Sequence, residues 1–148
     1  MKIFLDIDGV MVPAKGWLKQ EILEDGFPPF SKKAVQALQM LLTPHAEVIL
    51  TTSHRFNFTV DQWIQIFSNR NLQLSQIDIL PACSKAKSRK DEIMNWFEHD
   101  YKGESYLIID DDSSVDDLPN QLKKRLIKPS PHIGLTEELI NLILQSTL

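Results

Sequence analysis

The stretch KIFLDIDGV, residues 2–10, decides the fold of this 148-residue chain. Lys2–Ile7 has the short, continuous apolar pattern of a strand that is covered on both faces. It delivers Asp6 and Asp8 at its carboxyl end, with Gly9 directly after them. In an open α/β sheet, ligands bind just beyond the carboxyl ends of the strands. We therefore expect the two carboxylates to lie at a functional site.

Four further short aliphatic segments have the pattern of buried strands, and helix patterns lie between them. These strands are predicted at Glu47–Leu50, Ile77–Leu80, Tyr106–Ile109 and Arg125–Lys128. Helix starts are indicated by the capping residues Ser31, Thr59, Ser88 and Thr136. The inward-facing residues expected for the helices are Val35, Leu38, Leu41 and Leu42; Trp63, Ile66 and Phe67; Ile93, Trp96 and Phe97; and Leu139, Ile140, Ile143 and Leu144. The alternation predicts a three-layer, Rossmann-like α/β fold, with a central five-stranded parallel sheet and helices on both faces.

Composition narrows the class of protein. A length of 148 residues favours a single domain, residues 1–148, and 43% hydrophobic with 24% charged residues is ordinary for a globular protein. The net charge of −4 argues against broad binding to nucleic acid or anionic membranes. Cys83 is the one cysteine, so no intrachain disulfide can form. No segment reaches the roughly 18 apolar residues of a membrane span, so we expect a cytoplasmic protein.

Polar residues follow two more predicted strands. Thr51-Thr52-Ser53-His54-Arg55 follows the second strand and Asp110-Asp111-Asp112 follows the fourth, while Ser88-Arg89-Lys90 places cations at a helix start. Carboxyl ends of parallel strands meet at one edge of a sheet, so these groups are expected to converge. Phosphoryl transfer uses such a set, because positioning and charge neutralisation carry most of its catalysis. Clustered carboxylates also suit Mg²⁺, and a carboxylate can attack phosphorus.

Order and spacing of these motifs resemble the haloacid dehalogenase-like (HAD) hydrolase superfamily. Asp6-Ile7-Asp8-Gly9-Val10 resembles its first motif, Thr51 its second, the region around Lys90 its third, and Asp110-Asp111 its fourth. The whole chain resembles small capless bacterial members in particular, although His54 stands where their second motif has tryptophan. The resemblance implies a HAD-like fold with no true cap domain.

The resemblance also implies roles for the acidic residues. Asp6 would be the nucleophile and a metal ligand. Asp8 would be the general acid and base, with its backbone carbonyl on the metal. Asp110 and Asp111 would complete a Mg²⁺ site.

The remaining site residues are implied in the same way. Thr51 would bind the phosphoryl oxygens. Lys90 would neutralise charge on the nucleophile and phosphate, with Arg89 and Lys87 as alternatives for this third-motif cation. Substrate contacts are expected from Gly9, Thr52, His54 and Arg89.

The segment Pro13–Phe30 is irregular and follows the first motif, which predicts a flap or lip over the site. Its aromatic residues Trp17, Phe27 and Phe30 could stack on a substrate base. Aromatic residues in loops more often anchor the loop to the core, and we favour this interpretation for all three.

The expected function is a Mg²⁺-dependent phosphatase that hydrolyses phosphate monoesters through an aspartyl-phosphate. Its substrate would be a phosphorylated small molecule or a phosphorylated end of a macromolecule. We expect no membrane partner, and the protein could form an oligomer. One alternative is a phosphatase specific for nucleic-acid termini, which the basic residues Lys85, Lys87, Arg89 and Lys90 could serve. The negative net charge does not favour it. A noncatalytic HAD-fold binding module is the other alternative.

Overall fold

The computed structural model describes residues 1–146 and has a five-stranded sheet at its centre. The strands follow the order β3-β2-β1-β4-β5, and every pairing is parallel. Their bounds are β1 (Lys2–Leu5), β2 (Glu47–Leu50), β3 (Gln76–Ile79), β4 (Tyr106–Ile109) and β5 (Leu126–Ile127). The predicted Rossmann-like α/β fold is therefore confirmed.

Five α-helices and two short 3₁₀ helices connect the described strands and follow the last one. The α-helices are α1 (Lys32–Gln39), α2 (Val60–Ser68), α3 (Arg89–His99), α4 (Asn120–Lys123) and α5 (Glu137–Ser146), and the 3₁₀ helices are η1 (Ser53–Asn57) and η2 (Ser113–Asp117). All four predicted caps are confirmed, because the side chains of Ser31, Thr59, Ser88 and Thr136 each accept a backbone N–H from the first turn. Thr59 also forms the full capping box with Gln62.

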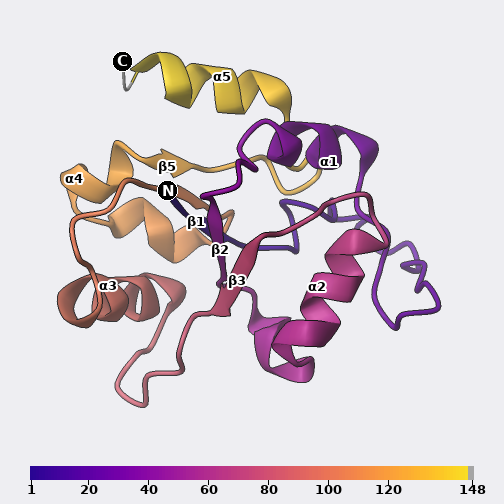
Figure 1. Cartoon of the computed structure of the whole chain (residues 1–148), viewed down its shortest axis with the longest axis horizontal. Coiled ribbons are helices and arrows are strands. Elements are labelled where there is room, and N and C mark those ends of the chain that lie inside the picture. Colours follow the sequence, from indigo (N-terminus) through magenta and orange to yellow (C-terminus); the bar gives the residue numbers. More distant parts are fainter. Residues whose placement is uncertain (147–148) are drawn as a thin grey trace.

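Helices cover both faces of the sheet, which explains the continuous apolar pattern of its strands. Ile3 and Leu5 of β1 face a core formed with α1, α2 and α5. Phe4 points the other way, into a second core formed with α3, η2 and α4. Figure 1 shows α3 and α4 on the opposite side of the strands from α1 and α2. Alternating residues of one buried strand thus serve two cores.

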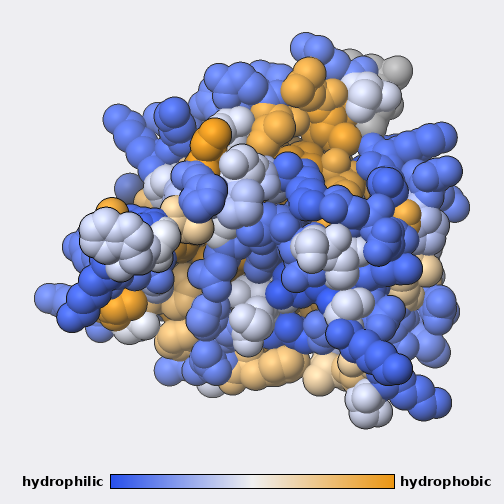
Figure 2. Space-filling view, turned by 180° about the vertical axis from the view of Figure 1, so that it is seen from behind, coloured by the Kyte–Doolittle hydropathy of each residue, from blue (hydrophilic) through white to orange (hydrophobic). Residues whose placement is uncertain are grey.

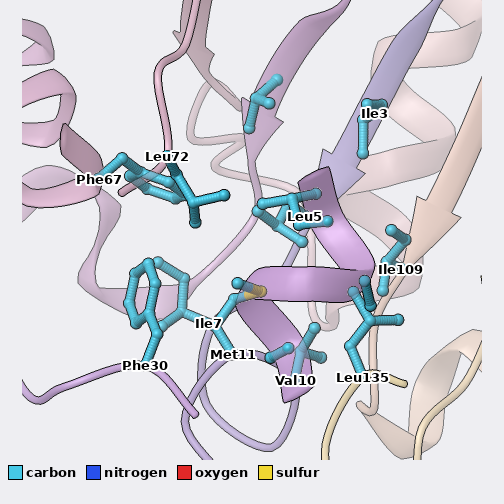
Figure 3. Packing of buried hydrophobic residues seen from close by; sticks show 14 of the residues in the cluster. Ile3, Leu5, Ile7, Val10, Met11, Phe30, Phe67, Leu72, Ile109 and Leu135 are labelled. Atoms are coloured by element: carbon cyan, nitrogen blue, oxygen red, sulfur yellow. The ribbon is translucent and has the colours of Figure 1, made fainter. Parts of the chain in front are cut away.

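The first strand ends two residues earlier than predicted, at Leu5 rather than Ile7. The chain turns there, because the Ile7 carbonyl accepts the backbone N–H groups of Val10, Met11 and Val12. Val10 and Met11 then enter the same core as Leu5 (Figure 3). Asp8 therefore lies in this turn and not in the β1 strand of the sheet.

Smaller differences from prediction occur at other ends. The predicted strand Ile77–Leu80 lies one residue too late, and Arg125–Lys128 is longer than β5. Leu144 was predicted to face inward, but it is 37% exposed. The C-terminal part of α5 extends past α1 (Figure 1). From behind, the surface is largely hydrophilic, with a hydrophobic area near the α5 end (Figure 2). None of the described helices is both long and apolar enough to cross a membrane.

The segment between β1 and α1 contains no α-helix or β-strand and is held at both ends. Near its start, the backbone N–H of Ala14 donates to the Pro131 carbonyl at 2.8 Å. Phe27 and Phe30 are buried, as predicted, and pack edge-to-face on aromatic rings of α2. Arg70 fixes this part by donating to the carbonyls of Phe27 and Pro28 and by pairing with Asp25 at 2.5 Å. Trp17 is 93% exposed, so the prediction that it anchors the loop is wrong.

Candidate active site

Strand register brings three polar residues together. The last residues of β2, β1 and β4 pair side by side. The next residue along each strand is Thr51, Asp6 or Asp110, and all three are buried. The Thr51 hydroxyl donates to Asp110 Oδ2 at 3.1 Å. The predicted convergence of these strand ends is therefore a feature of the structure.

Asp6, Asp110 and Asp111 form an acidic cluster. Each offers a carboxylate oxygen within 4.8 Å of the others. Burial, the neighbouring Asp110 charge and a hydrogen bond with Asp111 raise the pKa of Asp6 to about 9. A divalent cation would relieve this repulsion, and hard oxygen ligands are those that Mg²⁺ prefers. The cluster could therefore hold a metal ion, which would keep Asp6 ionised.

Arg89 supplies the cation beside this cluster. Its Nη1 lies 2.8 Å from Asp110 Oδ2, 3.4 Å from Asp6 Oδ1 and 3.3 Å from Thr51 Oγ1. These carboxylates raise the pKa of Arg89 against the opposing effect of burial, so its guanidinium stays charged.

The preference for Lys90 does not fit this geometry. The backbone N–H of Lys90 donates to Ser114, and across residues 1–146 its side chain makes no ion pair with an acidic group. Successive helix positions point about 100° apart, so Arg89 and Lys90 cannot both face the strand ends. Lys87 contacts Asp91 through its backbone N–H and likewise makes no ion pair within the described chain.

Asp8 lies outside the acidic cluster and faces a cavity. Its side chain is 53% exposed, and its Oδ2 lies 2.8 Å from His54 Nε2. Both residues line a cavity of about 400 Å³, together with residues between Val12 and Gln20. Asp6 and Asp8 therefore have different environments, one buried among charges and one open to the cavity.

Gly9 makes room for the acidic cluster. Its φ is +78°, and a Cβ at this position would lie 2.0 Å from Asp111 Oδ2. The residue also lines the cavity beside Asp8. Only glycine combines this backbone conformation with the close approach of Asp111.

The two threonines of the second motif are both fully buried. Thr52 accepts the backbone N–H of His54 at 3.2 Å and caps η1, so its hydroxyl orders the turn. A substrate would reach the Thr51 hydroxyl only by replacing its bond with Asp110. Neither residue presents a free hydroxyl to the cavity.

Arg55 is a structural residue that sequence reasoning did not identify. It is buried and donates to the carbonyls of Thr51, Thr52 and Leu80, and it pairs with Glu92 of α3. The sequence shows only an arginine within the polar stretch that follows an apolar strand. Its partner lies 37 residues away, which no local pattern reveals.

The chain matches a known family of protein domains. Residues 2–140 match the family model described as the HAD domain in Swiss Army Knife RNA repair proteins. No curated protein is similar enough to the chain to count as a match. The matched region contains all five strands, the acidic cluster, Asp8 and Arg89. The chain therefore belongs to this family of HAD domains, within the HAD-like superfamily.

Proposed function

We propose that this protein is a Mg²⁺-dependent phosphatase that hydrolyses phosphate monoesters through an aspartyl-phosphate on Asp6. The observation that carries the proposal is the contrast between Asp6, buried in a cluster that could hold a cation, and Asp8, open to a cavity. Family membership supports a hydrolase of this general kind. We further propose that residues 1–148 form one domain, with residues 13–30 as its flap.

The proposed reaction divides the chemistry between these carboxylates. Asp6, Asp110 and Asp111 would hold Mg²⁺, which when bound screens the charge of the phosphoryl oxygens. An Asp6 oxygen attacks phosphorus while the ester P–O bond breaks, and Asp8 gives its proton to the leaving oxygen. Asp8 then accepts a proton from the water that hydrolyses the aspartyl-phosphate. Arg89 neutralises charge beside Asp6.

Phosphate release from a panel of phosphate esters, with Mg²⁺ or EDTA, tests the proposal. We expect release to need both Mg²⁺ and Asp6, so that Asp6→Asn abolishes it. Asp78→Asn, an exposed aspartate on β3, is the matched control and should retain full activity. Mg²⁺-dependent release that survives Asp6→Asn would require a different nucleophile. Turnover that depends on Asp6 would exclude a noncatalytic binding module.

A phosphatase specific for nucleic-acid termini is the second candidate, because the matching family is described from RNA repair proteins. A second cavity of about 370 Å³ adjoins Arg89 and is lined by Lys87 and Phe56. The Phe56 ring is 58% exposed. A lysine and an accessible aromatic ring beside a phosphate site suit a single-stranded nucleic acid.

Neutralising Lys85 and Lys87 together tests this second candidate. We expect kcat/KM for a phosphorylated oligonucleotide to fall and to lose part of its salt dependence, while p-nitrophenyl phosphate is unaffected. The control is the paired neutralisation of Lys123 and Lys124, at and just after the end of α4. Failure of the wild-type protein to bind or process any oligonucleotide would reject this candidate.

A further inference from the structure

We propose that Asn57 and His54 form a hydrogen-bond relay that orients Asp8, which makes His54 a positioning residue for the acid–base step. The inference rests on the proposed phosphatase function. It concerns a residue that stands where the resembling family has tryptophan.

The contacts of the His54 imidazole indicate which ring nitrogen carries the hydrogen. Asn57 Nδ2 lies 3.5 Å from His54 Nδ1, and His54 Nε2 lies 2.8 Å from Asp8 Oδ2. A carboxylate oxygen can only accept, so the ring hydrogen that faces Asp8 is on Nε2, and Nδ1 can then accept from the Asn57 amide. His54 therefore donates to Asp8 Oδ2 and leaves Oδ1 free to face a substrate.

Two further contacts position the His54 imidazole. Its backbone N–H donates to Thr52 Oγ1, and its ring meets the buried Phe27 ring edge-on at 5.7 Å and 87°. The Asp8 side chain is 53% exposed, and within residues 1–146 its carboxylate has no other side-chain hydrogen bond than the one to His54. The hydrogen bond from the ring thus sets the direction of the Asp8 carboxylate, as preorganised catalysis requires.

This orientation acts when the ester bond breaks. As the Asp6 oxygen bonds to phosphorus, the electron pair of the breaking P–O bond stays on the leaving oxygen. The Oδ1 proton of Asp8 passes to that oxygen, the alcohol departs neutral, and Asp8 is left as a carboxylate bound by His54 N–H. A leaving alkoxide needs this proton, whereas p-nitrophenolate is stable without it.

The test compares an alkyl phosphate with p-nitrophenyl phosphate. We expect His54→Ala to lower kcat for the alkyl ester by ~10-fold or more, which is part of the full acid–base contribution, and to change kcat for p-nitrophenyl phosphate by only a few fold. His54→Gln should restore much of the loss, because its amide nitrogen can donate in place of Nε2. Asn57→Ala should show a weaker form of the same selectivity. His99→Ala, on α3, is the control.

Equal loss for both esters, or no loss for either, would overturn the positioning role. If the wild-type protein hydrolysed neither ester, the phosphatase proposal itself would fall. The relay is tested separately by nitrogen NMR of labelled histidine, with His54→Gln assigning the signal. We expect the Nε2–H form in the wild-type protein and a tautomer mixture in Asn57→Ala. An Nδ1–H form in the wild-type protein would overturn the relay.

Discussion

Asp6 and Asp8 are two residues apart and yet lie in different surroundings. Asp6 follows the last paired residue of β1 and is buried beside Asp110, whereas Asp8 lies within the turn that begins at Ile7. Environments that differ in this way allow two carboxyl groups to take opposite roles, one as a nucleophile and one as a proton donor. The two aspartates could be predicted from the sequence. Their separation could not, because it depends on where the strand stops.

Asp8→Asn is expected to lower the rate of phosphate release by ~10²–10⁴-fold, since an amide can neither donate the proton to the leaving group nor activate water. Steady-state kinetics at saturating substrate measure the effect. Mg²⁺ binding, followed by calorimetry, should persist because the acidic cluster is intact. An unchanged rate would remove Asp8 from the mechanism.

Gly9→Ala is expected to disrupt the acidic cluster, because it changes the backbone next to Asp111. A left-handed conformation costs a non-glycine residue about 1–2 kcal/mol, and the new Cβ would also displace Asp111. Mg²⁺ affinity should fall on the order of 10–100-fold. Gly26→Ala is the matched control, because Gly26 also has positive φ (+84°) but has nothing within 4 Å of its Cβ position. Equal Mg²⁺ affinity in the two variants, measured by calorimetry, would contradict this account.

At the scale of elements, an ion pair holds the carboxyl end of the segment between β1 and α1. Asp25 and Arg70 fasten residues near Phe27 to α2. The guanidinium of Arg70 lowers the pKa of Asp25 to about 2, against the opposing effect of burial. A carboxyl group with a lowered folded-state pKa stabilises the protein above its unfolded pKa, and this stabilisation is lost as pH falls through the folded value.

Acid should therefore weaken the wild-type protein more than Asp25→Asn. Between pH 5 and pH 2 we expect the free energy of unfolding to fall by on the order of 1–2 kcal/mol more in the wild type. Urea unfolding at a series of pH values measures this difference. Asp61→Asn, in the first turn of α2, should keep the wild-type pH dependence. Parallel curves for wild type and Asp25→Asn would show that the ion pair does not contribute.

The residues at which helices begin could be predicted from the sequence. The rotation of a helix about its own axis, which decides the side chains that face the sheet, could not. The capping side chains of Ser31, Thr59 and Ser88 act within three residues of themselves, so a local pattern reveals them. Whether Arg89 or Lys90 faces the strand ends depends on how α3 rotates against the sheet. Packing of Ile93 and Trp96 sets that rotation, and it is a tertiary effect.

At the scale of the molecule, Mg²⁺ binding should stabilise the whole fold, because its proposed ligands follow the ends of β1 and β4. A ligand that binds only the folded state adds about 2.7 kcal/mol at a concentration 100 times its Kd. We expect Mg²⁺ to raise the Tm of the wild-type protein and to leave that of an Asp110→Asn, Asp111→Asn double variant unchanged. Circular dichroism melting with and without Mg²⁺ measures this. A retained rise in the double variant would place the metal elsewhere.

The sequence predicted the sheet, its parallel character and the edge at which polar groups meet, because each rests on strand patterns and one general rule. Side-chain contacts between residues far apart in the sequence could not be predicted. Three features depend on how the loops pack in the folded protein. They are the Arg55 hydrogen bond to the loop after β3, the His54 contact with Asp8 and the exposure of Trp17.

The central place of β1 has a consequence for folding. Its partners β2 and β4 lie more than 40 and 100 residues further along the chain, as the pairs of Lys2 with Glu47 and Tyr106 show. Such high contact order slows folding, since long loops must close before these contacts reward it. Asp6, Arg89 and Asp110 therefore meet only after β1 has paired with β4. During refolding, catalytic activity should return together with global structure and never ahead of it.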